Sequence, residues 1–492
     1  MIHTPSVDWF ALAPSLVTLG AAAICLLSAV LTPRWLLRPF AAFVCAAGFL
    51  GGAAAAAVVY WKSPDAHLEV ANAISRDRFA ALAQIIVMGA GFLTVGVSYS
   101  ARMRRDHIGE YYALLATAGA GMAFLLQASN LMTLFLGLEW FSVCLYVLCA
   151  IETDLVGSLE SGLKYLIIGG MGSAVLLFGS ALVYGSTGEL GFAQIAGSVQ
   201  TNGLTHDPLL LVGLAMIIAG LAFKASVAPF HMWTPDVYDG APTPVTGFMA
   251  AATKAVALAL ALRLLTTAFP AKDEVWRVAL AVLGCISLAW GNIAALVQRR
   301  VKRLLAYSSI SHAGFMLIAV AAATPLGGKA LLYYLIPYSA VSVGAFAVVA
   351  ARERELGETV TLDNLAGFGW ERPLLGFAMA TFMLGFAGFP LTGGFTGKFY
   401  VFAAAFDRGW TWLVIVGVAA TLVSLYYYLA VIRSMFMRPA AELGLSPIGG
   451  SPPREIMLSS AVFLAMVVNI GSFIFVQPLV DLAGKAAGAL PL

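Results

Sequence analysis

The stretch LAFKASVAPFHMWTPDVYDGAPTP, residues 221–244, places a lysine, a proline and a histidine inside a run that is otherwise largely apolar. In the core of a soluble protein, Lys224 would be unfavourable without a partner. At the centre of a bilayer, a charged residue costs roughly 2.5–3.5 kcal/mol and usually marks a functional site. The rest of the chain decides between these two settings.

The composition identifies an integral membrane protein. Of the 492 residues, 61% are hydrophobic and only 11% are charged, whereas soluble domains carry about 25% charged residues. Apolar stretches of roughly 20 residues, long enough to cross a lipid bilayer, recur from end to end. The net charge of +3 is too small to suggest a nucleic-acid partner.

The apolar segments predict an all-α polytopic membrane protein with about 14 transmembrane helices. Their approximate limits are residues 9–31, 38–60, 79–100, 110–128, 130–151, 160–185, 209–238, 243–268, 275–297, 303–322, 328–350, 373–406, 410–436 and 456–480.

Two of these spans, 209–238 and 373–406, are longer than a bilayer requires and carry Pro229 and Pro390 near their middles. Proline removes a backbone donor and clashes with the preceding turn, so both spans are predicted to be broken helices. They are the seventh and twelfth spans. Because five is an odd number, two helices five spans apart cross the membrane in opposite directions, as equivalent helices of an inverted repeat do. The spacing therefore suggests two inverted five-helix repeats. The two halves share no strong residue identity, so this repeat rests on the spacing alone.

The expected organisation is therefore a leading segment 1–108 with helices 1–3, a first repeat 109–268 with helices 4–8, a second repeat 269–437 with helices 9–13, and a closing segment 438–492 with a loop and helix 14.

The distribution of Lys and Arg predicts the orientation. Loops after odd-numbered spans hold fifteen of them and the opposite loops hold eight. The larger group comprises Arg34, Arg38, Arg102, Arg104, Arg105, Arg299, Arg300, Lys302, Arg303, Arg352, Arg354, Arg372, Arg433, Arg438 and Arg454. Because cytoplasmic loops carry the excess of basic residues, both termini are expected on the non-cytoplasmic side.

Four charged residues lie inside predicted spans. Glu139, Lys224 and Lys254 are near the middles of their spans, and Lys398 lies in the second half of 373–406. One interpretation is a set of buried ion pairs that specify helix packing, but the lysines outnumber the one mid-span carboxylate. The favoured interpretation is a proton relay, because a buried lysine gains and loses its proton readily.

Three further polar residues are candidates. His312 lies mid-span among three serines in AYSSISHAGFM, and His231 lies just past Pro229. Each is either a packing residue or a relay member. Lys164 follows Glu160 by four residues, which is typical of a surface ion pair on a helix, and a relay role is equally open.

Two features receive no relay role. Arg263 lies near the outer end of its span and is expected to extend its charge to the membrane interface. The tyrosines of SLYYYLAV, residues 426–428, fit either an interface belt or helix packing.

The sequence predicts no cofactor in this chain. The five cysteines lie in apolar runs, and none forms a CxxC pair or lies near histidines at metal-ligand spacing. No glycine-rich phosphate loop follows a strand pattern, so nucleotide binding is not supported.

Four stretches resemble the antiporter-like subunits of respiratory complex I. They are LEWFSVCLYVLCAIE from residue 138, FKASVAPFHMWTPDVYDGAPTPVTGFMAAATK from residue 223, KRLLAYSSISHAGFML from residue 302 and GFPLTGGFTGKF from residue 388. The resemblance covers roughly residues 110–440. Where sister subunits tend to read WLPDAH, this chain reads WTPDVY, which favours the subunit N group of proton-pumping NADH:quinone oxidoreductases.

The resemblance implies broken helices 7 and 12 in two inverted repeats, and a hydrophilic axis through the middle of the membrane. The family's helix 5 glutamate matches Glu139, and its lysines on helices 7, 8 and 12 match Lys224, Lys254 and Lys398. The helix 6 lysine that pairs with that glutamate matches Lys164.

The expected function is proton translocation in a bacterial inner membrane, without redox chemistry in this chain. NADH, FMN, iron–sulfur clusters and quinone are expected in partner subunits, and the partners are other membrane subunits of complex I, including sister antiporter-like subunits. The alternatives are a subunit of a multisubunit cation/proton antiporter and a membrane scaffold that does not pump.

Overall fold

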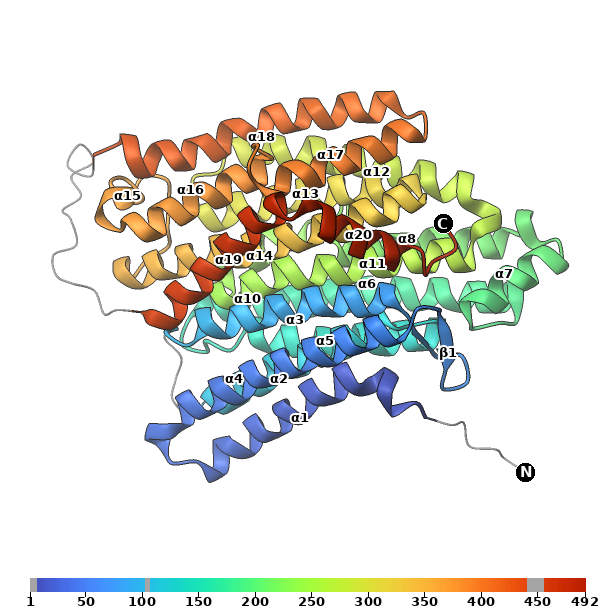
Figure 1. The fold of residues 1–492 in the computed structure, drawn as a ribbon, viewed down its shortest axis with the longest axis horizontal. Coiled ribbons are helices and arrows are strands. Elements are labelled where there is room, and N and C mark those ends of the chain that lie inside the picture. The colour runs from blue at the N-terminus through green and yellow to red at the C-terminus, as the bar shows by residue number, and fades with distance from the viewer. Residues whose placement is uncertain (1–6, 102–106, 440–454) are drawn as a thin grey trace.

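The computed structural model describes residues 7–101, 107–439 and 455–492, which form a bundle of helices running side by side (Figure 1). Arg102, Arg104, Arg105 and Arg454, used above to predict orientation, lie outside the described residues. In the described part, twelve helices are long and apolar enough to cross a membrane. They are α1 (Trp9–Leu31), α2 (Arg34–Lys62), α3 (Arg78–Ser98), α4 (Ile108–Leu126), α5 (Leu131–Cys149), α6 (Val156–Thr187), the continuous Thr243–Ala268 and Pro270–Leu296, α13 (Val301–Ala322), α14 (Pro325–Leu356), α18 (Thr411–Met437) and α19 (Ile456–Ile474).

The two remaining predicted spans are each divided into two shorter helices. The first consists of α8 (Pro208–Lys224) and α9 (Trp233–Gly240), and the second of α16 (Pro373–Ala387) and α17 (Gly393–Asp407). Pro229 lies between α8 and α9, and Pro390 lies between α16 and α17. The all-α polytopic fold is confirmed, whereas the inverted repeat and the four segment limits stay predictions.

Each gap contains residues that a helix does not accommodate. Ser226, with a φ of 61°, follows the end of α8, and Gly388 and Leu391, with φ values of 76° and 75°, follow the end of α16. A left-handed residue ends the helical hydrogen-bond pattern. The Ser287 hydroxyl accepts a hydrogen bond from the Ala228 N–H at 2.9 Å, so this buried donor in the first gap is satisfied.

The span 243–268 contains an irregularity that the sequence did not predict. It begins as α10 (Thr243–Phe248), widens into a π-helical turn at Met249–Thr253, and continues as α11 (Lys254–Ala268). Such turns are rare and occur frequently at functional sites. Lys254 is the first residue after the π-helical turn.

Smaller elements complete the fold. Strands β1 (His67–Glu69) and β2 (Ile74–Arg76) form an antiparallel hairpin, and His67 pairs with Arg76. The remaining helices are α7 (Phe192–Thr201), α12 (Asp273–Leu296), α15 (Phe368–Glu371) and α20 (Val476–Ala487), with short 3₁₀ turns at Leu204–His206 and Pro270–Lys272.

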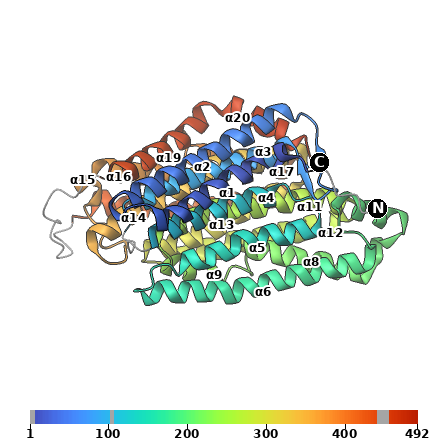
Figure 2. The same ribbon diagram turned by 90° about the horizontal axis from the view of Figure 1, so that it is seen from below.

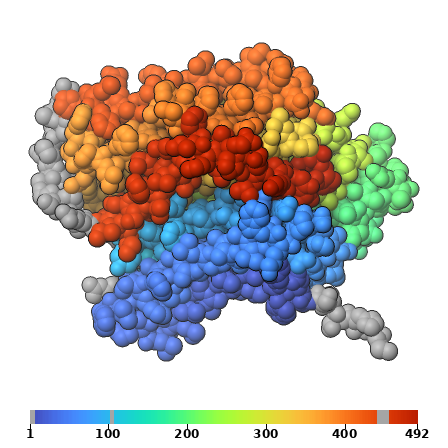
Figure 3. Space-filling model, in the orientation of Figure 1, coloured from blue at the N-terminus to red at the C-terminus, as the bar shows by residue number. Residues whose placement is uncertain are grey.

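The helices form a buried centre and an apolar periphery. Helices α11, α13 and α14 are almost wholly buried, whereas α6, α18 and α19 expose much of their apolar surface. Helices α19 and α20 lie across one face, between the N-terminal helices and α16–α18 (Figure 3), and α6 lies on the opposite side (Figure 2). Helix α1 begins and α20 ends at the same end of the bundle (Figure 1).

The structure contradicts the expectation that Arg263 reaches the membrane interface. Its side chain is buried, and its two terminal nitrogens donate to the two carboxylate oxygens of Asp77 at 2.7 and 2.8 Å. Asp77 also caps α3 by accepting from the Ala80 N–H. Burial raises the pKa of Asp77, but Arg263 and the other donors outweigh this and hold the pKa below its ordinary value. The prediction was wrong because Asp77 is remote in sequence.

Candidate functional site

Lys224 is the last residue of α8 and is 2% exposed. Its ammonium donates to the Ser142 hydroxyl of α5 at 2.7 Å and to the Tyr165 hydroxyl of α6 at 3.2 Å. It also lies 4.6 Å from the centre of the Phe141 ring, a cation–π contact that favours the charged form. Its hydrogen-bond partners are therefore two neutral hydroxyls.

Lys254 follows the π-helical turn and is fully buried. Its ammonium donates to the Tyr238 hydroxyl of α9 at 3.3 Å and lies 5.5 Å from the centre of the same ring. Tyr238 is also buried, and its ring contacts Trp233, which stacks on Tyr165 with a centroid distance of 4.6 Å. A continuous aromatic group thus joins the surroundings of Lys254 to those of Lys224.

Lys398 lies in the second turn of α17 and is 4% exposed. Its ammonium donates to the carbonyl oxygen of Ala387, the last residue of α16, at 3.0 Å. It also lies 4.6 Å from the centre of the Phe315 ring on α13. The C-terminal end of α16 therefore binds the ammonium group of Lys398, which lies on α17.

His312 lies on α13 and is buried. Its Nδ1 is 2.7 Å from the Tyr334 hydroxyl of α14, and its Nε2 is 3.0 Å from the Tyr428 hydroxyl of α18. Because both ring nitrogens face hydroxyls, the imidazole can accept a proton on one side and release one on the other. A hollow of about 10 Å³, about the volume that one water molecule needs, lies beside this ring and is also lined by residues of α14, α16 and α17.

Glu139 and Lys164 are not brought together in this structure. Lys164 pairs instead with Glu160 at 2.7 Å and with Asp236 at 3.1 Å, and its side chain is 39% exposed. Glu139 is partly buried on α5, and its Oε1 is buried without a hydrogen-bond partner among the described residues. The i,i+4 ion pair between Glu160 and Lys164 that the sequence suggested therefore exists. The pairing of Lys164 with Glu139 that the family resemblance implies is not among the described ion pairs.

His231 lies in the gap after α8 and is 8% exposed. Its Nδ1 has no hydrogen-bond partner in the described part of the chain, and its ring centre lies 5.9 Å from that of Trp290. Unlike His312, it shows no hydroxyl on either side that would connect it to a lysine.

The central lysines form no ion pair with a carboxylate in the part of the chain that the structure describes. Within residues 7–101, 107–439 and 455–492, no ion pair includes Lys224, Lys254 or Lys398. Each is instead held by a neutral oxygen and an aromatic ring. In the same residues, no group of His, Cys, Asp or Glu has the number and geometry to hold a metal ion.

The tyrosines were not predicted as site residues. Tyr165, Tyr238, Tyr334 and Tyr428 supply the hydroxyls next to the buried lysines and His312. For residues 426–428, the sequence left open an interface belt or helix packing. Tyr428 is 1% exposed and therefore packs between helices, whereas Tyr426 is 69% exposed. The only available signal was the polar serine cluster beside His312, because a tyrosine in an apolar span fits a core equally well.

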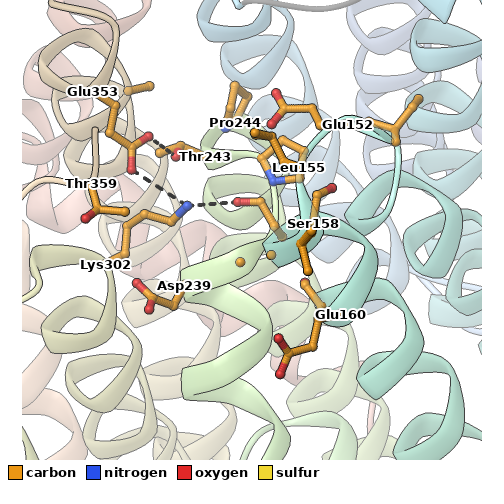
Figure 4. A pocket seen from close by; sticks show the side chains of 18 of the residues that line it. Glu152, Leu155, Ser158, Glu160, Asp239, Thr243, Pro244, Lys302, Glu353 and Thr359 are labelled. Atoms are coloured by element: carbon orange, nitrogen blue, oxygen red, sulfur yellow. Dashed lines mark hydrogen bonds and ion pairs between the residues drawn. The ribbon is translucent and has the colours of Figure 1, made fainter. Parts of the chain in front are cut away.

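A second feature is a hollow of about 770 Å³ at one end of the bundle, which we call the vestibule (Figure 4). Its carboxylates are Glu152, Asp154, Glu160, Asp236, Asp239, Glu353 and Glu358. Its basic side chains are Lys164, Arg300, Lys302, Arg303 and Arg354, with His107 nearby. Among the residues that the structure describes, the lining therefore carries seven carboxylates and five Lys or Arg side chains.

One buried cation is fixed at the wall of the vestibule. Lys302 donates to the Ala241 carbonyl at 2.8 Å, and its ammonium lies 3.8 Å from Glu353 Oε1. Thr243 donates its hydroxyl proton to the other oxygen of Glu353. Together these three side chains hold the corner between α9 and α10 against α13 and α14 (Figure 4).

The fold and the buried lysines define a polytopic membrane protein of the antiporter-like class. Residues 128–424, more than half of the chain, match the family described as NADH:quinone oxidoreductase/Mrp antiporter, TM. NADH-quinone oxidoreductase subunit N of Trichlorobacter lovleyi is 42% identical over 393 residues, covering 80% of each chain. Subunit N 2 of Roseiflexus castenholzii is 39% identical and covers 98% of this chain and 97% of its own.

A solved structure gives the same result. A chain of respiratory complex I from Thermus thermophilus, with bound aureothin, superimposes with a TM-score of 0.77 at 32% identity, over 95% of this chain and 99% of that one. The chain described here belongs to the NADH:quinone oxidoreductase/Mrp antiporter family and, within it, to the subunit N family of NADH-quinone oxidoreductases.

Proposed function

We propose that this chain is a membrane-arm subunit of a bacterial NADH-quinone oxidoreductase and moves protons across the membrane. The proton movement is coupled to quinone reduction in other subunits, so the chain acts as part of a translocase without a redox centre of its own. Membership of the subunit N family and the resemblance to a chain of a whole complex I support this proposal.

The observation that carries the proposal is the set of three buried lysines, none of which forms an ion pair with a carboxylate among the described residues. A buried ammonium ion without a counter-charge is energetically unfavourable, and release of its proton removes that cost. The same lysine regains a proton when one is delivered, because its neutral amine remains a good base. Lys224, Lys254 and Lys398 therefore have the chemistry of proton carriers.

The other candidates have different roles in this proposal. His312 passes protons between the hydroxyls of Tyr334 and Tyr428, in the region between Lys254 and Lys398. Glu139 biases the protonation of Lys224 by its charge, because a nearby carboxylate favours the ammonium form. Lys164 holds the outer end of α6 through Glu160 and Asp236, and His231 is the weakest member of the relay.

The proposal assigns the redox chemistry to partners. NADH, FMN, iron–sulfur clusters and quinone belong to other subunits, and the direct partners are other membrane subunits, including sister antiporter-like subunits. The chain lies in the bacterial inner membrane with both termini on the non-cytoplasmic side, as the excess of Lys and Arg in the opposite loops predicts.

Two other functions remain distinguishable by purification from native membranes. Co-purifying flavin and iron–sulfur proteins support the proposal, whereas membrane subunits alone indicate a cation/proton antiporter. A scaffold that does not pump predicts full proton uptake after all three central lysines are neutralised.

The direct test replaces Lys224. We expect Lys224→Ala to assemble and to lose most NADH-driven proton uptake by inverted membrane vesicles. Lys224→Arg should also be poor, because arginine keeps its proton in a protein. Lys329→Ala, which removes a lysine that contacts only the Tyr400 ring among the described interactions, is the control. Full uptake by the Lys224→Arg complex contradicts the relay role.

A further inference from the structure

Helix α5 presents two neighbouring side chains, Phe141 and Ser142, to the ammonium group of Lys224. Both are fully buried. The Ser142 oxygen lies 2.7 Å from the ammonium nitrogen, closer than the Tyr165 oxygen at 3.2 Å. The centre of the Phe141 ring lies 4.6 Å away, closer than the ring of Tyr146 at 5.8 Å or that of Tyr165 at 5.2 Å. The shortest polar contact and the shortest ring contact of this lysine therefore come from adjacent residues of one helix.

We propose that Ser142 and Phe141 are positioning residues that hold Lys224 in its ammonium form, and that they thereby set the pH at which this lysine is loaded with a proton. The inference rests on the proposed function, in which Lys224 is a proton carrier, and it adds the groups that stabilise the loaded lysine. It also separates two roles around one ammonium group, because the Tyr165 hydroxyl is then the group that passes the proton on.

The Ser142 hydroxyl is fixed as an acceptor toward the lysine. It donates its own proton to the carbonyl oxygen of Leu138, one turn earlier in α5. A hydroxyl has a single proton to donate, so the Ser142 oxygen meets Lys224 only as an acceptor. A hydrogen bond from an ionised donor is roughly twice as strong as one from a neutral donor. The contact with Ser142 therefore favours the ammonium form over the neutral amine.

The aromatic rings act in the same direction. The rings of Phe141, Tyr146 and Tyr165 surround the ammonium group, and Phe141 has no polar atom through which it could interact otherwise. The face of an aromatic ring attracts a cation, and the attraction is strongest where water is excluded. Because Lys224 is 2% exposed, these rings supply part of the stabilisation that a counter-ion would provide.

The Tyr165 hydroxyl is not committed in this way. Its one hydrogen bond among the described residues is the bond that it accepts from Lys224, so its own proton has no acceptor there. When the lysine is neutral, the lone pair of the amine can accept that proton in a hydrogen bond, whereas Ser142 keeps its proton on the Leu138 carbonyl. Tyr165 can therefore serve both forms of the lysine, and Ser142 serves the charged form.

The other groups around Lys224 leave the direct contacts to Ser142 and Phe141. The titratable groups that face it are Glu139, Tyr146 and Cys149 of α5 and Tyr165 of α6. Helices α9 and α11 also pack near this end of α8, and within the described residues they add no charge that acts on the ammonium group. Glu139 acts through space, without an ion pair, so it adds to the contacts of Ser142 and Phe141 and does not replace them.

The test measures the ratio of proton uptake to NADH oxidation between about pH 6 and pH 9, in inverted vesicles that contain the assembled complex. We expect this ratio to fall as the pH rises, because Lys224 is then no longer loaded. Ser142→Ala should move the midpoint of the fall about one unit toward lower pH. Such a shift is a tenfold loss of proton affinity, as expected for the loss of a hydrogen bond to a charged group. The ratio at about pH 6 should stay near that of the parent complex.

A second variant and two controls accompany this measurement. Phe141→Leu keeps an apolar side chain and removes the ring, and it should move the midpoint in the same direction by roughly half a unit. Ser142→Thr keeps the hydroxyl and should restore the parent profile. Ser180→Ala is the matched control, because Ser180 is also buried and donates to a carbonyl one turn earlier, that of Leu176, but contacts no lysine among the described residues.

The outcomes separate this inference from the proposed function. An unchanged midpoint in Ser142→Ala and Phe141→Leu, or a shift toward higher pH, overturns the inference, while a loss of uptake in Lys224→Ala still supports the relay. An equal loss at every pH in Ser142→Ala places Ser142 on the transfer path and also overturns it. If Ser142→Ala does not assemble on native gels, the midpoint of Phe141→Leu decides. Full uptake by Lys224→Ala overturns the proposed function itself.

Discussion

The two broken helices hold their lysines in different ways. In the first, Lys224 ends α8 and donates to the hydroxyls of Ser142 and Tyr165. In the second, Lys398 lies beyond the gap in α17 and reaches back to the Ala387 carbonyl at the end of α16. Both ammonium groups lie near the C-terminal end of a half-helix, where the helix dipole favours a positive charge.

The difference lies in what the partners can do with a proton. A hydroxyl both accepts and donates hydrogen bonds, so it can pass a proton on, whereas a backbone carbonyl only accepts. The surroundings of Lys224 are therefore suited to transfer, and the carbonyl at Lys398 is suited to holding a charged lysine in place. A pair of similar breaks in one chain can thus serve two different steps.

The largest expected effect tests the packing of the second break. Residues 388–394 contain three glycines, whereas 225–232 contain none. A Cβ on Gly394 would lie 1.9 Å from the Gly385 carbonyl oxygen. Gly394→Ala should therefore force α16 and α17 apart and destabilise the chain by about 3 kcal/mol. Native gels and the melting temperature of the purified complex measure this loss.

The control for that variant is Gly471→Ala on α19, where an added Cβ meets no heavy atom within 4 Å. If the Gly394→Ala complex assembles and melts like the Gly471→Ala complex, the second break tolerates separation of α16 and α17. The close packing of these two helices at Gly394 would then not contribute to the stability of the chain.

An intermediate effect tests the transfer chemistry of the first break. Tyr165→Phe keeps the ring stacked on Trp233 and removes only the hydroxyl beside Lys224. We expect proton uptake to fall about tenfold, as for loss of a positioned proton-transfer group. Tyr333→Phe is the matched control, because the Tyr333 hydroxyl is also buried but donates only to the Ser472 carbonyl. Equal losses in the two variants would mean that Tyr165 acts through stability.

The smallest expected effect concerns Glu139 of α5, whose charge is proposed to act on Lys224 at the first break and not on Lys398 at the second. Glu139→Gln keeps the shape and removes the charge, whereas Glu139→Asp keeps the charge. We expect the glutamine variant to lose roughly threefold in NADH-driven uptake, because Glu139 is partly exposed and its field is screened. The aspartate variant should retain most of the activity. The reverse ranking would assign Glu139 to packing, since glutamine is the closer isostere.

The sequence predicted the features that are unusual in a membrane. Lys224, Lys254 and Lys398 stand out because charge is rare in apolar spans, and Pro229 and Pro390 stand out because proline disrupts helices. These five positions were enough to predict the broken helices and to select the lysines whose burial the structure shows.

The remaining parts of the site depend on contacts between distant segments. Tyr165 and Tyr428 look like ordinary apolar residues until the fold brings them to Lys224 and His312. Lys164 was correctly paired with Glu160 by spacing, but Asp236 lies 72 residues away from it. The π-helical turn before Lys254 has no sequence signal of its own, because MAAAT is compatible with an ordinary helix.

The ion pair between Asp77 and Arg263 has a consequence for how the protein is made. The two residues are 186 positions apart, so at ribosomal speeds of about 5–20 residues per second, Arg263 emerges roughly 10–40 s after Asp77. Until Arg263 is in place, a buried Asp77 carboxylate has no cation beside it, which is unfavourable. We therefore expect the Asp77 end of α3 to pack fully only after α11, which carries Arg263, has been inserted.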